Sequence, residues 1–283
     1  MAAHDLPERA IAITVIKTTG DRVLDRPLSE AGGKGLFTKE IEEALLSNEV
    51  DVGVHSMKDM QTVLPDGLAI GGVLPREDPR DAFISLRHAD FSSLPLNAVV
   101  GTSSLRRKAQ ALHTRPDLRV VEFRGNVQTR LRKLAEGVAE ATFLAVAGLK
   151  RLGMEDRITA PVATEHMLPA AAQGVIALEI RDGDEATAAL IAPLNDPETA
   201  LAATAERTFL ARMEGSCRTP IAGHAVIRSG EMFFRGQILS VDGSMSYEAS
   251  RMGPPDDAVD IGLAAADEIL TQADPAILVR SNV

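Results

Sequence analysis

Apolar and polar residues follow two different spacings along the first 60 residues of the chain. Ile11, Ile13 and Val15 recur at every second position, which predicts a strand, and a short apolar run at 50–54 predicts another. Between them, residues 36–47 carry apolar side chains three or four positions apart, the spacing of an amphipathic helix. The chain therefore begins as an alternation of strands and helices.

The alternation continues through the middle of the chain. Apolar runs predict strands at 67–73, 82–86, 97–100, 118–123, 140–146 and 174–180, and amphipathic stretches predict helices at 103–113, 126–136 and 185–193. Such alternation is typical of α/β layers, so we expect mixed, mainly parallel sheets.

The pattern changes near residue 195. A long Ala-rich helix at 197–214 precedes strands at 223–229, 232–240 and 245–251 and a helix near 257–272, which together indicate a separate α+β domain. The predicted division is a first lobe from 1–75 and 174–194, a second lobe from 76–173, and a C-terminal α+β domain from 195–283.

Composition narrows the possible functions. Only 3% of the 283 residues are aromatic, which argues against base stacking on nucleic acid. No apolar run approaches the ~18 residues of a membrane span, and charged residues precede the first apolar stretch, unlike a secretory signal. The single cysteine excludes an internal disulfide and a cysteine-rich zinc site, so we expect a cytosolic protein without a bound metal.

Positive charge is concentrated in one stretch of this acidic chain. Residues 101–133 hold nine Lys or Arg against two Asp or Glu, whereas the net charge of the whole chain is −10. Thr102 and Ser104 are suited to capping a helix start, whose free N–H groups bind anions. Arg106 and Arg107 follow in the first turn, where the helix dipole disfavours cations unless an anion is bound. The alternative is a solvated helix start without a ligand.

Further arginines follow later predicted strands. Arg124, Arg130 and Arg151 come after strand ends, and together with the first pair they describe a cationic cleft for carboxylates or phosphates. A nucleic-acid groove would also be basic, but the acidic remainder of the chain and the scarce aromatic residues weigh against it.

Two other positions are candidates for chemistry. Lys58 and Asp59 follow the strand at 50–54, where open α/β sheets bind ligands, so Asp59 could stabilise a cation or move a proton. The alternative is a turn aspartate that caps a short helix. Cys217 lies in a loop of small residues beside Arg218, which would favour its thiolate, although a lone cysteine is often a buried structural thiol.

Several long motifs, in order along the chain, resemble the hydroxymethylbilane synthase family, also called porphobilinogen deaminases. They are GGKGLFTKEIEEALL at 32–46, HSMKD at 55–59, PREDPRDAF at 75–83, GTSSLRR at 101–107, RGNVQTRL at 124–131 and LAVAGLKRLG at 144–153. The resemblance covers residues 16–283 and implies two periplasmic-binding-protein-like (type II) lobes with a third α+β domain.

The resemblance also implies a function. The family joins four porphobilinogen molecules head to tail into hydroxymethylbilane, with release of ammonia, during heme biosynthesis. It implies a dipyrromethane cofactor bound covalently to Cys217, a catalytic role for Asp59, and a monomer whose partner is the small-molecule substrate rather than nucleic acid or a membrane. Further cofactor contacts are implied at Lys58, Thr102, Ser104, Arg106, Arg107 and Arg130, and substrate contacts at Arg124, Arg130, Arg151, Lys34, Phe37 and Gln173.

The N-terminal part of the chain departs from the family pattern. Family members begin with a strand and a helix that this chain lacks, so we expect unpaired backbone groups and uncovered apolar surface in the first lobe. Two other interpretations therefore stay open. One is an impaired, shortened copy of the enzyme, and the other is a non-catalytic two-lobed module that binds a polycarboxylate.

Overall fold

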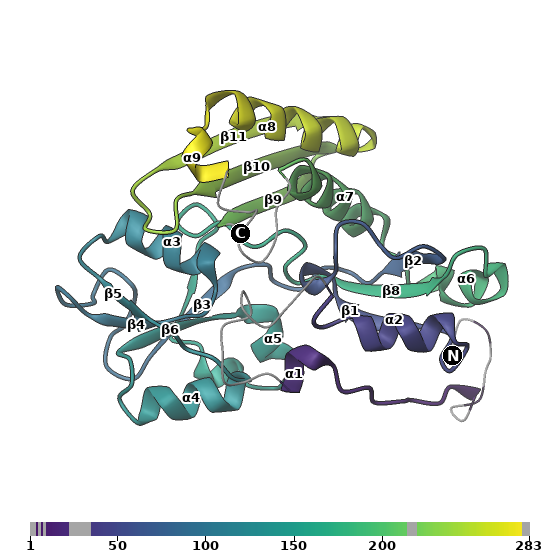
Figure 1. Cartoon of the computed structure of the whole chain (residues 1–283), viewed down its shortest axis with the longest axis horizontal. Coiled ribbons are helices and arrows are strands. Elements are labelled where there is room, and N and C mark those ends of the chain that lie inside the picture. The colour runs from purple at the N-terminus through teal and green to yellow at the C-terminus, as the bar shows by residue number, and fades with distance from the viewer. Residues whose placement is uncertain (1–3, 5–6, 8–9, 23–34, 214–219, 279–283) are drawn as a thin grey trace. The chain divides into compact units, whose positions relative to one another are not determined.

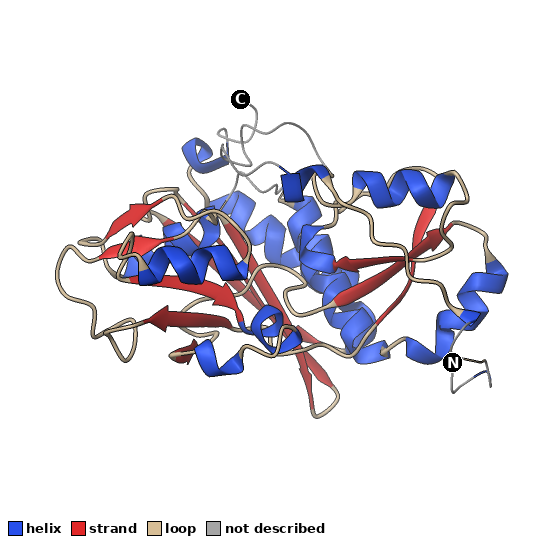
Figure 2. Ribbon diagram, turned by 90° about the horizontal axis from the view of Figure 1, so that it is seen from below, coloured by secondary structure: helices blue, strands red, loops and turns tan. Residues whose placement is uncertain are grey.

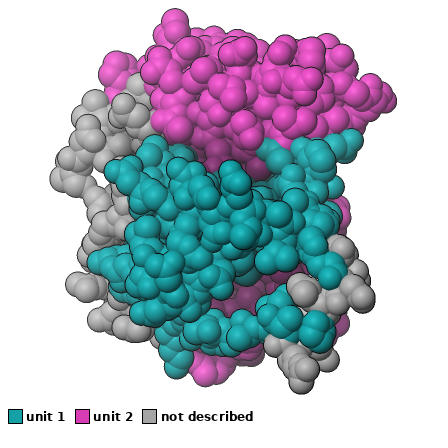
Figure 3. Space-filling view, turned by 90° about the vertical axis from the view of Figure 1, so that its right-hand side faces the viewer, with its two compact units in different colours: residues 1–76, 175–200 teal, residues 77–174, 201–283 magenta. Residues whose placement is uncertain are grey.

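The computed structural model describes residues 4, 7, 10–22, 35–213 and 220–278. The chain forms two compact units (Figure 3). Unit 1 comprises residues 1–76 and 175–200, and unit 2 comprises residues 77–174 and 201–283. Unit 1 is therefore assembled from two separate parts of the sequence.

Unit 1 contains a three-stranded antiparallel sheet of order β1-β8-β2 (Figure 1). Its elements are α1 (Thr19–Arg22), α2 (Lys39–Leu46), β1 (Gly53–Ser56), the 3₁₀ helix η3 (Met57–Asp59), β2 (Leu68–Val73), β8 (Ile176–Arg181), α6 (Glu185–Ile191) and η5 (Ala192–Leu194). Helix α2 contacts all three strands and buries Ala44 and Leu45. The central strand is β8, so the sheet is complete only when the chain has returned from unit 2.

The first sheet of unit 2 has five strands in the order β5-β4-β6-β3-β7. The elements are β3 (Asp81–Ser85), β4 (Val99–Gly101), α3 (Leu105–Thr114), β5 (Arg119–Val121), α4 (Val127–Ala135), β6 (Ala141–Ala145), α5 (Val146–Arg151), η4 (Glu155–Arg157) and β7 (Ala160–Val162). Every residue of β3 is buried, because the sheet has a hydrophobic cluster on each face. Phe83 and Phe143 belong to one cluster, and Phe123 and Leu149 belong to the other.

The second sheet of unit 2 is an antiparallel meander of order β11-β10-β9 (Figure 1). Figure 2 distinguishes the helices and strands of the chain by colour. It consists of β9 (Ile221–Arg228), β10 (Glu231–Leu239) and β11 (Ser246–Gly253), with α7 (Pro197–Arg212), η6 (Pro255–Asp257), α8 (Ala258–Gln272) and α9 (Pro275–Leu278). Phe209, Phe234 and Ile269 are fully buried in its core. The turn at Gly243 lies against α3, where an added Cβ would meet the backbone nitrogen of His113 at 2.5 Å.

The predicted fold class is confirmed, with one difference in strand direction. The chain is α/β with mixed sheets, followed by an antiparallel sheet with helices. Among the described strands, parallel pairing is limited to β4 with β5 and β6, so the sheets are not mainly parallel. The other described strand pairs, in the sheet of unit 1, around β3 and in the meander, are antiparallel.

The strand predicted around Ile13 is wrong. Residues 12–18 have no regular secondary structure, and the side chains of Ile13 and Val15 are 90% and 84% exposed. None of the three strands in the described sheet of unit 1 pairs with this segment. A strand needs a neighbour for its backbone N–H and C=O groups, so apolar alternation without that neighbour does not produce one.

Candidate active site

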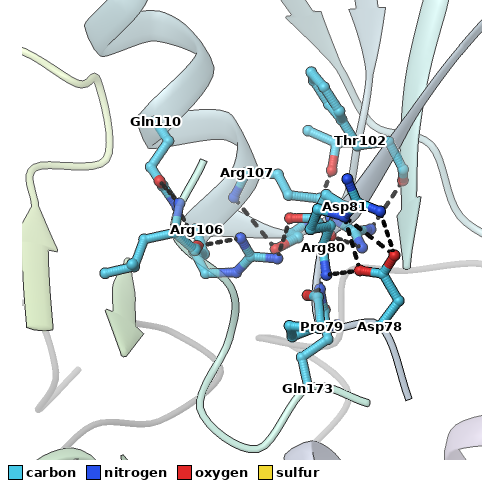
Figure 4. A network of polar contacts seen from close by, with 12 residues as sticks. Asp78, Pro79, Arg80, Asp81, Thr102, Arg106, Arg107, Gln110 and Gln173 are labelled. Atoms are coloured by element: carbon cyan, nitrogen blue, oxygen red, sulfur yellow. Dashed lines mark hydrogen bonds and ion pairs between the residues drawn. The ribbon is translucent and has the colours of Figure 1, made fainter. Parts of the chain in front are cut away.

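Asp81 lies between two arginines in the interior of unit 2 (Figure 4). It is the fully buried first residue of β3. Arg107 donates from Nε and Nη2 to Oδ1 of Asp81 at 3.1 and 2.7 Å, and Nη2 of Arg106 lies 2.8 Å from Oδ2. Two guanidinium groups therefore share one carboxylate, which leaves a surplus of positive charge.

Backbone carbonyls fix the orientation of both arginines. Nη1 of Arg107 donates to the carbonyl of Phe143 at 2.9 Å, and Nη1 of Arg106 donates to the carbonyl of Leu168 at 2.7 Å. Gln110 holds the same segment, since it donates to the Leu168 carbonyl and accepts from the Leu168 N–H. The guanidinium groups are thus held in place before any ligand binds.

The charges in this network set the pKa of Asp81. Burial alone would raise the pKa, but Arg106 and Arg107 outweigh burial and hold the pKa well below its usual value. Burial lowers the pKa of Arg106, and Asp81 opposes that change. The carboxylate is therefore ionised at neutral pH, as its buried position between two cations requires.

The start of α3 uses the hydroxyl groups that the sequence analysis singled out. Oγ of Ser104 caps the helix and accepts from the Arg107 N–H at 3.4 Å, while Oγ1 of Thr102 accepts from the Ser104 N–H at 3.2 Å. A hydroxyl also donates, so the half-buried Ser104 can give a hydrogen bond to an acid oxygen at this position.

A second group of cations surrounds the start of α4. Arg124 is 9% exposed, and Arg130 donates from Nε to the carbonyl of Gly125 at 2.8 Å. Burial lowers the pKa of Arg130 to about 10, and the positive charges of Arg107 and Arg124 add to that effect. The charges of these arginines therefore repel one another, and a carboxylate bound beside Arg130 would relieve the repulsion.

Gln173 connects the two segments in which the chain crosses between units. Its Nε2 donates to the carbonyl of Pro79 at 2.7 Å and to Oδ1 of Asp81 at 3.1 Å. The N–H of Glu77 donates to the carbonyl of Gly174, and Arg151 donates to the same carbonyl at 2.8 Å. The structure therefore places Gln173 in contact with Asp81 and Arg151 beside Gly174.

Asp59 ends the 3₁₀ helix that follows β1 in unit 1. The residue keeps an exposed surface, yet surrounding protein atoms desolvate its carboxyl group and raise its pKa, while the charges of Lys58 and His55 lower it. Lys58 is half-buried and precedes Asp59 in the same helix. Asp59 is thus an accessible carboxyl group with positive charge close to it.

The other predicted site residues are only partly described. Phe37 is half-buried in the turn before α2, and Arg151 is exposed at the end of α5. Lys34 and Cys217 lie outside the described residues.

The structure also reveals functional candidates that the sequence analysis missed. Asp81 is one, because only its pairing with Arg106 and Arg107 distinguishes it from other acidic residues. Another is the buried pair of His55 and Glu179, whose side chains meet across β1 and β8. An acidic residue within an apolar strand was the available signal for Glu179, which lies in the run IALEI.

The described parts of the chain contain neither a metal-binding cluster nor a membrane-spanning helix. Within residues 35–213 and 220–278 and the shorter described stretches, no group of three or more His, Cys, Asp or Glu is arranged to hold a metal ion. The same residues include no helix with the length and apolar character that crossing a bilayer requires.

Two solved structures match part of the chain at low sequence identity. A YaeC family lipoprotein from Enterococcus faecalis covers 56% of this chain and 76% of its own, with 16% identity and a TM-score of 0.37. A periplasmic substrate-binding protein of an ABC transporter from Coxiella burnetii covers 59% and 79%, with 14% identity and a TM-score of 0.38.

Sequence comparisons show much closer relatives. Residues 1–189 match the family model "Porphobilinogen deaminase, dipyromethane cofactor binding domain", and residues 200–271 match "Porphobilinogen deaminase, C-terminal domain". Porphobilinogen deaminase from Paracoccus denitrificans is 58% identical over 96% of this chain and 87% of its own length. The chloroplastic porphobilinogen deaminase of Pisum sativum is 52% identical over 97% of this chain and 76% of its own. The chain therefore belongs to the porphobilinogen deaminase family.

Proposed function

We propose that Asp59 and the arginines of unit 2 have separate roles in the porphobilinogen deaminase reaction. As a member of this family, the chain is a transferase of tetrapyrrole biosynthesis. It joins four porphobilinogen molecules head to tail into hydroxymethylbilane and releases ammonia from each. The family match favours this enzyme over a non-catalytic module that binds a polycarboxylate.

The cofactor of this family is dipyrromethane. We assign its attachment to Cys217, the single cysteine of the chain. When bound, the cofactor supplies the pyrrole to which the first substrate is joined. The donor groups of unit 2 fit it, because each of its pyrroles carries two carboxylates and an arginine donates two parallel hydrogen bonds to a carboxylate.

The grouping of buried arginines in unit 2 is the observation that carries its assignment to acid binding. Burial and the neighbouring charges of Arg107 and Arg124 bring the pKa of Arg130 to about 10, so the cluster favours an incoming anion. We therefore assign cofactor contacts to Lys58, Thr102, Ser104, Arg106, Arg107 and Arg130, and substrate contacts to Arg124, Arg130, Arg151, Lys34, Phe37 and Gln173.

Asp59 is assigned the chemical step. Departure of ammonia leaves a cationic pyrrole, and an ionised carboxylate beside it would lower the energy of that cation. Burial raises the pKa of Asp59, so the ionised form needs the nearby positive charges of Lys58 and His55. A carboxylate with these neighbours suits a site that stabilises a cation and exchanges a proton with it.

The remaining assignments follow from the family. We infer that the three sheets correspond to domains at 1–75 with 174–194, 76–173 and 195–283. We also infer that the chain works as a cytosolic monomer on a small-molecule substrate, without nucleic acid or membrane.

Intact-mass spectrometry of the purified chain tests the proposed function. The wild-type protein should exceed its sequence mass by one dipyrromethane, and porphobilinogen should add further pyrrole units and release ammonia. Cys217→Ser should carry no pyrrole. The same adduct on this variant would refute the attachment site, and a wild-type protein without adduct or ammonia release would support a binding module.

A further inference from the structure

A buried acid–base cluster lies next to the candidate catalytic carboxylate in unit 1. Nε2 of His55 on β1 lies 2.9 Å from Oε2 of Glu179 on β8, with side-chain exposures of 2% and 0%. Glu42 of α2 is buried on the same side of the sheet. Asp59 follows four residues after His55, at the end of the 3₁₀ helix that continues β1. His55, Glu179 and Glu42 are not among the residues assigned above to the cofactor, the substrate or the chemical step.

The backbone of β1 creates the space for this pair. Gly53 and His55 both point to the buried face of β1, and the strand register sets Gly53 directly opposite Glu179. A Cβ at Gly53 would lie 2.8 Å from Nε2 of His55, so the imidazole ring occupies the volume that a side chain would fill. The backbone at Gly53 is not left-handed, and glycine is therefore needed here for space alone.

The carboxylate of Glu179 depends on His55 for a counter-charge. Neither oxygen of Glu179 accepts an aligned hydrogen bond from the described residues, although Oε2 is within ion-pair distance of His55. A fully buried carboxylate without a counter-charge is strongly unfavourable. Burial raises the pKa of Glu42, and the charge of Glu179 raises it further, so Glu42 favours its neutral form. The His55 ring is therefore the group that can supply a counter-charge to Glu179, with Glu42 buried beside the pair.

We propose that His55, paired with the buried Glu179 over Gly53, is a positioning residue whose positive charge close to Asp59 favours the ionised carboxylate. This inference rests on the proposed role of Asp59. The charged and titratable groups that act on the cluster are Glu42 and Glu43 from α2, Glu179 from β8, and Lys58 and Asp59 from η3. His55 is buried, so its effect passes through Asp59 rather than through contact with substrate.

The charge of His55 acts to lower the pKa of Asp59, which favours the ionised carboxylate. Desolvation is the largest effect on the pKa of Asp59 and raises it, and the charges of Lys58 and His55 both act to lower it. Lys58 is on the same short helix and half-buried, whereas His55 is fixed in the sheet. His55 therefore supplies a charge whose position does not depend on a flexible side chain.

The first test follows Asp59 and His55 directly by NMR in the purified full-length protein. Nitrogen-15 shifts of the wild-type His55 ring should show an imidazolium at the pH of turnover, and a neutral ring would overturn the proposal. The carboxyl carbon of Asp59, assigned by its loss in Asp59→Asn, should titrate at higher pH in His55→Gln than in the wild type. An unchanged titration in a folded variant would also overturn it.

A second variant moves the ring without removing it. Gly53→Ala places a methyl group against Nε2 of His55, and we expect the Asp59 titration and the acidic limb of the kcat/KM profile to shift to higher pH, as in His55→Gln. Val54→Ala is the matched control, because Val54 is on the same strand but 61% exposed. A merely structural role would lower stability in Gly53→Ala without moving either titration, which would contradict the inference.

These measurements separate the inference from the proposed function. If Asp59→Asn keeps near-normal turnover, the proposed role of Asp59 is wrong, whatever the NMR titration shows. If Asp59→Asn is inactive but neither His55→Gln nor Gly53→Ala moves the Asp59 titration, the role of Asp59 stands and that of His55 fails.

Discussion

The two units differ in the ratio of acidic to basic groups among their buried side chains. In unit 1, the imidazole of His55 lies within ion-pair distance of Glu179 and acts electrostatically on the carboxyl groups of Glu42 and Asp59. In unit 2, the carboxylate of Asp81 forms ion pairs with both Arg106 and Arg107. Acidic groups therefore outnumber the positive charges of His55 and Lys58 in this part of unit 1, whereas arginines outnumber the one carboxylate in unit 2.

The difference indicates what each unit is built to receive. A surplus of guanidinium groups favours the acetate and propionate groups of pyrroles, which stay anionic throughout the reaction. An accessible carboxylate with a tuned pKa favours a positive charge that exists only briefly, when ammonia leaves. Most of the proposed contacts to the permanent ligand charge are thus in unit 2, whereas the transient reaction charge is assigned to Asp59 of unit 1.

Loss of the carboxylate in unit 1 should have the largest effect. Asp59→Asn keeps the size of the side chain but removes its negative charge, and we expect kcat to fall roughly 10²–10⁴-fold. Steady-state assays of product formation measure this. The matched control is Asp66→Asn, an exposed acidic residue of the same unit that should keep wild-type turnover. Comparable activity of the two variants would remove the functional contrast between the units.

Loss of the carboxylate in unit 2 should instead lower stability. Asp81→Asn leaves Arg106 and Arg107 buried without their counter-charge, and we expect the free energy of unfolding to fall by about 3–5 kcal/mol. Urea denaturation checks this value. Asp117→Asn, which breaks a half-buried ion pair with Arg115 at the surface, should cause a much smaller change. Equal losses in the two variants would show that burial does not distinguish Asp81.

The stability supplied by Asp81 should depend on pH in a defined direction. Its pKa is lower in the folded state than the ordinary 3.8, so its contribution is fully present above that value and is lost as the pH falls below it. The difference in unfolding free energy between wild type and Asp81→Asn should therefore be constant near neutral pH and shrink in acid. Urea unfolding at several pH values measures it, and a difference that grows in acid would contradict the assignment.

Removal of one cation from the arginine cluster should separate binding from stability. Arg130→Gln removes a charge repelled by Arg107 and Arg124 and a hydrogen bond to the Gly125 carbonyl. We expect KM for porphobilinogen to rise roughly ten- to a hundredfold, with a much smaller loss of unfolding free energy than in Asp81→Asn. Kinetic assays and urea denaturation on the same samples check both results. Arg132→Gln, at the exposed side of the same helix, should change neither. A loss of unfolding free energy as large as that of Asp81→Asn would show that this arginine is structural.

The helix caps should contribute least. Ser104→Ala and Asn126→Ala remove the side-chain caps of α3 and α4, and each should lower the free energy of unfolding by about 0.5–2 kcal/mol. The effect of Asn126 should be the larger, since its cap bond to the Thr129 N–H is 2.9 Å long against 3.4 Å for Ser104. Thermal or urea unfolding resolves the order, and a reversed order would contradict the geometry.

Local patterns in the sequence predicted most elements and the basic stretch at 101–133, because strand and helix periodicity and charge density are properties of neighbouring residues. Partnerships between distant residues were not predictable in this way. Asp81 finds Arg106 and Arg107 only after β3 and α3 are packed together, and Glu179 meets His55 only after β8 returns between β1 and β2. The wrong strand near Ile13 has the same origin, since pairing depends on a neighbour elsewhere in the fold.

The buried turn at Gly243 has a consequence for the construction of unit 2. Its backbone meets that of α3 so closely that no methyl group would fit beside His113, whose Nδ1 lies 2.8 Å from the Gly243 carbonyl. The backbone of the meander therefore packs directly against the backbone of α3 at this point. The absence of a side chain at Gly243 sets the distance between the two. Any larger residue there would act as a wedge that lifts the meander away from the helix bearing Arg106 and Arg107.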